Sequence, residues 1–250
     1  MRVSAPHRGF SLLELLIGMF LTGLLITAIT SLLGGSVSAY RQQLVQGQLE
    51  ESSRFAHEIL DSHITEAGFD PRPWQNPAGL GAVTSESVNG AQQTGDQLGL
   101  QRRSNRNCYG NDNPVTAADG SPEFHLLQTR FEVTSANNLA MTCRYGPGVT
   151  QLTTQVNNFG LVENVQSMQV LYAEDRNGDG TADGWVRAGE WQQESQVLAV
   201  KIALLFVSAR AFNRAESKVV NLLDESITTP PDGRLRNVST LTATIRGRLK

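Results

Sequence analysis

The fold of this chain is decided by Gly9-Phe10-Ser11-Leu12-Leu13-Glu14-Leu15-Leu16-Ile17-Gly18, the start of an apolar run that continues to Leu33. Between Phe10 and Leu33 the only charged residue is Glu14. As a helix, the run would rise about 36 Å, which is enough to cross a hydrocarbon core of about 30 Å. A carboxylate at the centre of a bilayer costs roughly 2.5–3.5 kcal/mol, and less near the edge. Glu14 is therefore a candidate for a functional role.

The nine residues before this run form a short basic leader. They contain Arg2, His7 and Arg8 and no acidic residue. A basic leader before an apolar segment is also typical of secretory signal peptides, and a small-x-small cleavage site is present at Val37-Ser38-Ala39. However, the apolar run is longer than the usual 7–15 residues and carries a glutamate. An ordinary signal peptide and a plain single-pass anchor are thus less favoured alternatives.

The order of glycine, phenylalanine and then glutamate four residues later resembles the class III signal of type IV pilins and of the pseudopilins of type II secretion. The resemblance implies that a prepilin peptidase cuts between Gly9 and Phe10 and removes residues 1–9. It also implies that the new amino group of Phe10 is methylated. Glu14 would then pair with the Phe10 amine of a neighbouring subunit, because a carboxylate among apolar helices is tolerated when it is paired. Residues 10–33 would form the transmembrane and filament-core helix.

The helical pattern continues beyond the membrane segment. Apolar residues recur three or four positions apart at Tyr40, Leu44, Leu49, Ala56, Leu60, Ile64 and Ala67. Gly68 is a helix-ending residue, and Pro71 and Pro73 prevent continuation. We expect one helix from 10 to 67, with an amphipathic part over 34–68. Any kink is expected at Gly34-Gly35, where helix propensity is low.

The remaining residues, 69–250, are predicted to form one β-rich head. Strands are expected over 96–103, 124–134, 138–145, 149–156, 161–172, 197–207 and 241–248, with 213–237 as a loop. The run 197–207 is apolar on both faces and is therefore predicted to be a central strand. One helix followed by many strands predicts an α+β fold, in which a long N-terminal helix packs on an antiparallel sheet, as in type IV pilins.

Two cysteines, Cys108 and Cys143, lie in the predicted head. The positive charges of Arg2 and Arg8 favour a cytoplasmic N-terminus, with the head on the other side of the membrane. That compartment is oxidising, so we predict a disulfide between the two cysteines. Such a bond would contribute on the order of 3–4 kcal/mol by closing a loop of about 35 residues.

The charge of the chain gives no general attraction toward nucleic acid. The net charge is −3, and removal of Arg2 and Arg8 leaves 19 basic against 24 acidic residues, or −5. A small basic cluster at Arg102, Arg103 and Arg106 is interpreted as a solvated loop face, with a DNA-contact patch as the less favoured alternative.

The segment Asp175-Arg-Asn177-Gly-Asp179-Gly-Thr181-Ala-Asp183 matches the first nine positions of a calcium loop. Position twelve is Val186, where an EF-hand requires glutamate, so the segment is not an EF-hand. Ca²⁺ could still bind Asp175, Asn177, Asp179, Thr181 and Asp183, with Glu174 or Glu190 completing the shell. The alternative is a turn rich in glycine and acidic residues that joins two strands.

No nucleophile elbow, phosphate loop or metal-ligand spacing of the four histidines is present, so we do not predict an enzyme.

Residues 165–172, the Asp175–Gly180 segment, Trp191 and residues 197–205 together resemble the PilW family of minor type IV pilins. Ala173-Glu174 departs slightly from that family's usual pattern, and residues 69–160 match nothing that we recognise. The resemblance implies a minor pilin that takes part in pilus priming or in the tip. Its partners would be other minor and major pilins, the prepilin peptidase and, before assembly, inner-membrane lipid. The protein would lie in the inner membrane with a periplasmic head, and later in the pilus at the cell surface. The alternatives are a minor pseudopilin of type II secretion and a tip module that binds a surface or DNA.

Overall fold

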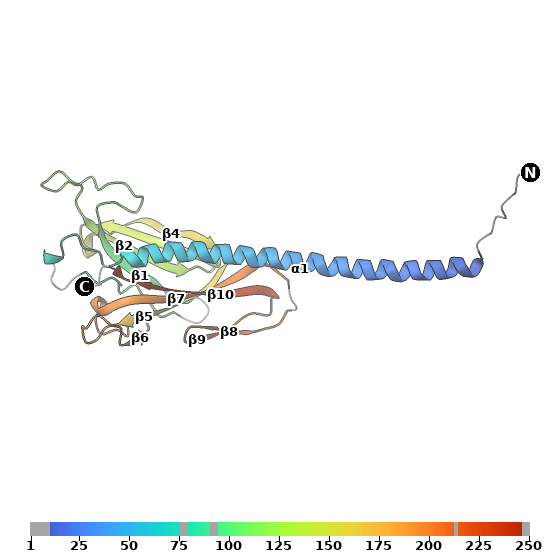
Figure 1. The fold of residues 1–250 in the computed structure, drawn as a ribbon. Coiled ribbons are helices and arrows are strands. Elements are labelled where there is room, and N and C mark those ends of the chain that lie inside the picture. The colour runs from blue at the N-terminus through green and yellow to red at the C-terminus, as the bar shows by residue number, and fades with distance from the viewer. Residues whose placement is uncertain (1–10, 76–79, 91–94, 213–214, 247–250) are drawn as a thin grey trace, which may run out of the picture. The chain divides into compact units, whose positions relative to one another are not determined.

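The structure is a computed structural model, and it describes residues 11–75, 80–90, 95–212 and 215–246. These residues form one α-helix, α1 (Leu12–Glu66), and ten β-strands, and Figure 1 shows how these elements follow one another along the chain. The bounds of α1 confirm the single long helix expected from the sequence, and the helix continues through Gly34 and Gly35. The chain divides into two compact units, residues 1–47 and residues 48–250, which are described separately below.

The first unit contains the apolar part of α1. Its side chains are exposed, and α1 is long and apolar enough to cross a membrane, with a mean hydropathy of 2.3 in its most apolar window. The hydroxyl groups of Thr22, Thr30 and Ser36 donate to carbonyl oxygens four residues earlier, at 2.6, 2.9 and 2.8 Å. These hydroxyls are therefore satisfied inside the helix, as an apolar environment requires.

The second unit begins with the last five turns of α1, which pack against the head. One stripe of this segment is buried and consists of Leu49, Ser53, Ala56, Leu60 and Ile64, followed by Ala67. The sequence pattern predicted the apolar members of this stripe but not Ser53. It was wrong for Tyr40 and Leu44, which belong to the first unit and are 61% and 51% exposed.

The end of α1 is set by Gly68, as the sequence predicted. Gly68 has a positive φ of 74°, and its N–H donates to the carbonyl of Gln101 at 2.8 Å. A Cβ at this position would lie 3.2 Å from the Cβ of Ala82, so the close approach of the two segments also requires glycine.

The head contains two four-stranded sheets in which every strand pair is antiparallel (Figure 1). The first sheet has the order β1-β2-β3-β4, with β1 Leu98–Ser104, β2 His125–Val133, β3 Asn138–Gly146 and β4 Thr153–Glu163. The second has the order β10-β7-β5-β6, with β5 Val165–Glu174, β6 Gly184–Val186, β7 Val197–Ala211 and β10 Arg234–Thr244. A separate hairpin joins β8 Val219–Leu222 to β9 Glu225–Thr228. Short 3-10 turns lie at Pro73–Gln75, Val149–Gln151 and Glu194–Gln196. The α+β prediction is confirmed.

The strand β7 is central, as its apolar sequence predicted. Ile202 pairs with Val170 of β5 on one side and with Leu241 of β10 on the other. Ala203 and Leu205 pack with Leu222 and Ile227 of the β8–β9 hairpin.

Several predicted strand bounds were wrong. The strand predicted over 149–156 begins with a 3-10 turn and continues as β4 to Glu163, and the one predicted over 161–172 is divided at Asn164, where φ is 63°. The predicted loop 213–237 contains β8, β9 and the start of β10. The final strand was predicted over 241–248, but β10 runs from Arg234 to Thr244. Its polar first half pairs with β7, and such tertiary pairing overrides weak local propensity.

Candidate functional site

Glu14 lies in the first turn of α1, in an exposed position. The helix is capped by Ser11, whose Oγ accepts the N–H of Glu14 at 3.3 Å, so Ser11 and Glu14 stand at the two positions of a capping box. A shallow groove of about 600 Å³ follows the same side of the helix, lined by Glu14, Leu15, Gly18, Met19, Thr22, Gly23 and Ile26. Small residues on such a face allow another helix to approach closely.

The partner predicted for Glu14 is the Phe10 amine of a neighbouring subunit, not a residue of the same chain. Among the described residues, no cation forms an ion pair with the Glu14 carboxylate. Gly9 and Phe10, the predicted cleavage and methylation site, lie outside the described residues. The pairing of Glu14 with a Phe10 amine therefore stays a prediction.

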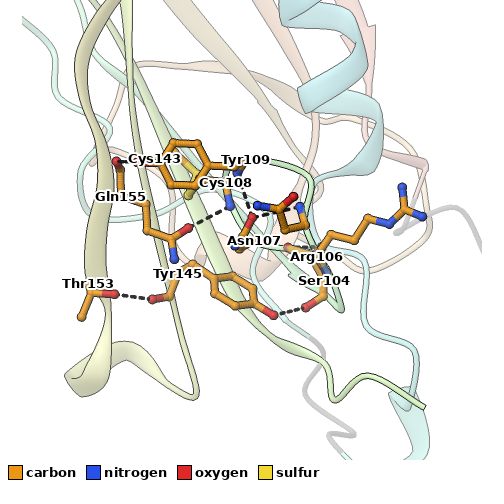
Figure 2. The surroundings of a disulfide bond; sticks show 10 residues. Ser104, Arg106, Asn107, Cys108, Tyr109, Cys143, Tyr145, Thr153 and Gln155 are labelled. Carbon is orange, nitrogen blue, oxygen red and sulfur yellow. Dashed lines mark hydrogen bonds between the residues drawn. A yellow bond between two sulfur atoms is a disulfide. The ribbon is translucent and has the colours of Figure 1, made fainter. Parts of the chain in front are cut away.

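The two cysteines of the head form a disulfide, which confirms the sequence prediction (Figure 2). The Cα atoms of Cys108 and Cys143 lie 5.9 Å apart, across a sequence separation of 35. Cys143 is buried on β3 in a small cluster with Leu127 and Tyr145. Cys108 belongs to the loop that follows β1, so the bond attaches this loop to the middle of the first sheet.

Hydrogen bonds around the disulfide attach the same loop to β4. The N–H of Cys108 donates to the side-chain carbonyl of Gln155 at 2.9 Å, and the Tyr109 hydroxyl donates to the backbone carbonyl of Gln155 (Figure 2). The Tyr145 hydroxyl donates to the carbonyl of Ser104 at 3.1 Å, at the end of β1. Sequence reasoning did not identify Gln155. Its role depends on the folded head, where it contacts Cys108 and Tyr109, which are 47 and 46 positions away in the sequence.

The three arginines considered as a DNA-contact patch are each engaged by a carboxylate. Arg102 lies 3.2 Å from Glu66, Arg103 lies 3.7 Å from Asp70, and Arg106 lies 3.3 Å from Asp112, nitrogen to oxygen. Each pair reduces the positive charge available to a polyanion, so the structure favours the solvated loop face over a nucleic-acid patch.

The candidate calcium loop joins β5 to β6. Asp175 accepts the N–H groups of Gly178 and Gly180 at 2.7 and 2.9 Å, and Asp183 accepts the N–H of Arg176 at 2.7 Å. Asp179 accepts the N–H of Thr181 at 2.8 Å, and the hydroxyl and amide of Thr181 hold the pKa of Asp179 below its ordinary value. The loop is thus a tight connection in which the carboxylates bind their own backbone.

The same loop does not gather a cluster of acidic ligands. Within the described ranges, no group of three or more His, Cys, Asp or Glu side chains lies close enough to share a cation. The oxygen atoms that Asn177 and Thr181 offer are amide and carbonyl ligands, which calcium also accepts. Calcium binding by Asp175, Asn177, Asp179, Thr181 and Asp183 stays a prediction.

Glu174, considered as an additional calcium ligand, has other partners. It is fully buried at the end of β5, where it accepts the Arg176 Nε–H at 2.9 Å and the N–H of Gln192. Burial by itself raises the pKa of this carboxyl, but the hydrogen bonds from Arg176 and Gln192 outweigh it and the net pKa is lowered. Glu174 therefore holds the loop to the segment around Gln192.

Sequence reasoning missed a buried carboxylate at Asp96. Its side chain accepts the N–H of Gly90 at 2.9 Å and the N–H of Val170 at 2.7 Å, so it joins the segment before β1 to β5. Only 3% of Asp96 is exposed, and this burial raises its pKa to about 6. The sequence gives no indication that Asp96 is buried, because an aspartate in a polar segment is ordinarily exposed to solvent.

Two family descriptions match the regions described above. Residues 5–30 match the prokaryotic N-terminal methylation motif, which covers the end of the leader, Glu14 and the groove of α1. Residues 130–247 match Type IV Pilus-assembly protein W, which covers the head from the middle of β2 to the end of β10. The head of this chain is thus of the PilW type from residue 130 onward, and its start carries the pilin methylation motif. Families of this kind are structural pilins rather than enzymes.

The fold is similar to that of a type IV-like pilin from Thermus thermophilus, with a TM-score of 0.51 and 18% sequence identity. The similarity covers 81% of this chain and 97% of that chain. At such an identity it shows the shared fold alone. A comparison with curated proteins found no match.

Proposed function

We propose that this protein is a minor pilin of the PilW type that joins other pilins in the complex that primes type IV pilus assembly or forms the pilus tip. The main support for the proposal is that one chain contains both a pilin methylation motif and a PilW head. Residues 5–30 match the methylation motif at the start of an apolar helix, and residues 130–247 match the PilW head. The mechanism is helix packing with pairing of Glu14, rather than catalysis.

The proposal includes a processing step and a location. The prepilin peptidase cuts between Gly9 and Phe10, and the Phe10 amine is methylated. Before assembly the protein spans the inner membrane among its lipids, with the basic N-terminus in the cytoplasm and the head in the periplasm. The leader charges and the disulfide of the head support this topology, because disulfides persist in oxidising compartments. After assembly the protein lies in the pilus at the cell surface.

The test is recovery of the full-length, tagged protein from membranes, followed by identification of its partners by mass spectrometry. We expect other minor pilins and the major pilin of the type IV pilus. Recovery of secretion-system pseudopilins in their place would support the pseudopilin alternative and refute the proposal. Glu14→Ala is the matched variant, because it leaves the apolar helix intact and removes only the group assigned to subunit pairing.

A further inference from the structure

The two sheets of the head end at four edge strands, which are β1 and β4 in the first sheet and β10 and β6 in the second. An edge strand presents backbone N–H and C=O groups that no neighbouring strand binds, and such a row readily pairs with another extended chain. Proteins therefore cover, bend or shorten their edge strands unless the edge serves an interaction.

Three of these four edges are protected. The edge of β1 is covered by earlier segments of the chain, since the Gln101 N–H donates to the carbonyl of Ala82 at 2.9 Å. The Arg103 N–H donates in the same way to the carbonyl of Phe69 at 2.8 Å. The pairing of β4 with β3 is interrupted by three register shifts, and Asn158 of β4 has a φ of 47°. The edge strand β6 has only three residues.

The fourth edge, β10, has none of these devices over most of its length. Its register with β7 is unbroken from Arg236 to Thr244, and the irregularity of this pair lies before that stretch, between Arg234 and Arg236. Residues 237–245 contain no proline, no glycine and no charged side chain. Their exposed members are all β-branched, namely Val238, Thr240, Thr242 and Thr244. This strand is therefore a regular, uncharged edge of the kind that pairs with another strand.

The backbone groups of the same four residues point away from β7. In an antiparallel pair, the backbone groups of successive residues alternate between the two sides of a strand. The Ile245 N–H donates to the carbonyl of Leu198 in β7 at 2.8 Å, so the odd-numbered residues of β10 bind β7 and the even-numbered residues face outward. Within the described ranges, no other group binds the outward N–H of Val238, Thr240 or Thr242.

Contacts on the inner face hold β10 in place beside this open edge. The Ser53 hydroxyl of α1 donates to the Ser239 hydroxyl at 2.6 Å, and the Ser239 hydroxyl lies 3.2 Å from Nε2 of His57. Two residues further along β10, Leu241 pairs with the fully buried Ile202. The edge is thus ordered before a partner arrives, and this order lowers the entropy cost of binding.

We propose that the β10 edge, residues 238–244, binds an extended strand from the head of another pilin, which adds a fifth strand to the four-stranded second sheet. This inference rests on the proposed function, since it names the surface through which this head contacts a neighbouring pilin. The pairing uses backbone hydrogen bonds between the two heads and is separate from the packing of the N-terminal helices.

The chemistry of the edge identifies the occupant as an extended chain. A helix binds its own N–H and C=O groups, and lipid and nucleic acid offer no row of alternating donors and acceptors at this spacing. The exposed valine and threonine side chains favour an uncharged partner strand rich in threonine, valine or isoleucine, because such residues pair well across strands. Pairing of two β10 edges from two copies of this chain would close a dimer and leave neither edge for the other pilins of the complex.

The experiment places a photo-crosslinking amino acid at position 240 or 242 of the full-length, tagged protein, in membranes of cells that assemble pili. We expect each position to capture a pilin other than this chain, and peptide mapping should place both crosslinks in one strand of its head. Because paired strands lie in register, moving the crosslinker from position 240 to 242 should move the captured residue by about two positions along that strand. Crosslinks that scatter over the partner, or that fall in its N-terminal helix, would refute strand addition.

A proline substitution tests the backbone contact directly. Thr240→Pro removes one outward N–H without breaking a bond to β7, and edge strands tolerate proline at such positions. It should reduce the crosslink from position 242 at least tenfold, whereas the matched control Thr240→Val keeps the N–H and should leave the crosslink unchanged. The melting temperature and the Cys108–Cys143 disulfide show whether each variant is folded. An undiminished crosslink in folded Thr240→Pro protein contradicts backbone pairing, and if this variant does not fold, the register measurement decides alone.

A further crosslinker at Leu24, in the apolar part of α1, separates this inference from the proposed function. Capture of pilins from position 24 with no product from positions 240 and 242 overturns the edge contact and leaves the minor-pilin proposal standing. Capture of β10 from a second copy of this chain also overturns the proposed occupant, because the edge is then closed in a dimer. Failure of all three positions to capture any pilin overturns both proposals.

Discussion

Removal of the Cys108–Cys143 disulfide should destabilise the head by an amount that follows from its position. The sequence separation of 35 residues gives a loop-closure contribution of about 4 kcal/mol in the unfolded state at 25 °C. For a head of this size, each kcal/mol lowers the melting temperature by about 2–4 °C, so the expected fall is about 8–16 °C. The loop after β1 should open first, because the Gln155 contacts are weaker than the covalent bond that holds it to its sheet.

The assay is thermal unfolding of the full-length protein in detergent, with and without a thiol reductant. The variant Cys108→Ala with Cys143→Ala serves as the control, because it should melt at the reduced temperature whether or not reductant is present. Protease cleavage in residues 105–113 should appear in the reduced protein before global unfolding. A shift below about 2 °C, with no new cleavage, would refute the reasoning and assign the position of the loop to the Gln155 contacts.

Three further changes give separate results. Glu14→Ala should leave membrane insertion unchanged but reduce recovery of partner pilins at least tenfold by quantitative mass spectrometry, and unchanged recovery would remove the assigned role. The raised pKa of Asp96, about 6 against an ordinary 3.8, means that the folded state takes up a proton, so this group adds stability as pH falls from 6 toward 4 and loses it as pH rises. The free energy of unfolding of the wild type should change by about 2–3 kcal/mol between pH 4.5 and pH 7 because of this group, and Asp96→Asn should remove that change, as denaturant titrations at the two pH values would measure. An equal change in both proteins would contradict the burial argument. Millimolar Ca²⁺ should raise the melting temperature of the wild type, and Asp175→Ala with Asp179→Ala should abolish the effect; the absence of any shift in the wild type would favour a simple strand connection.

Some elements could be predicted because their signals are local. The bounds of α1 followed from apolar periodicity and from Gly68, and β7 followed from an uninterrupted apolar run. The disulfide followed from the presence of two cysteines in a chain whose leader places the head in an oxidising compartment.

Other features depend on contacts that the sequence does not display. The β8–β9 hairpin has four-residue strands and turns at Leu223 with a φ of 53°, a conformation that a leucine does not signal. Asp96 is buried only because β5 comes to lie beside the segment before β1.

The account rests on the claim that this chain is processed as a pilin, and the identity of its first residue tests that claim most directly. Mass spectrometry of the protein recovered from membranes should find a mature N-terminus at Phe10 that carries a methylated amino group. The same measurement in cells that lack the prepilin peptidase should find the uncut leader. An intact Met1 in peptidase-containing cells, or a start at Tyr40 after cleavage at Val37-Ser38-Ala39, would contradict the account.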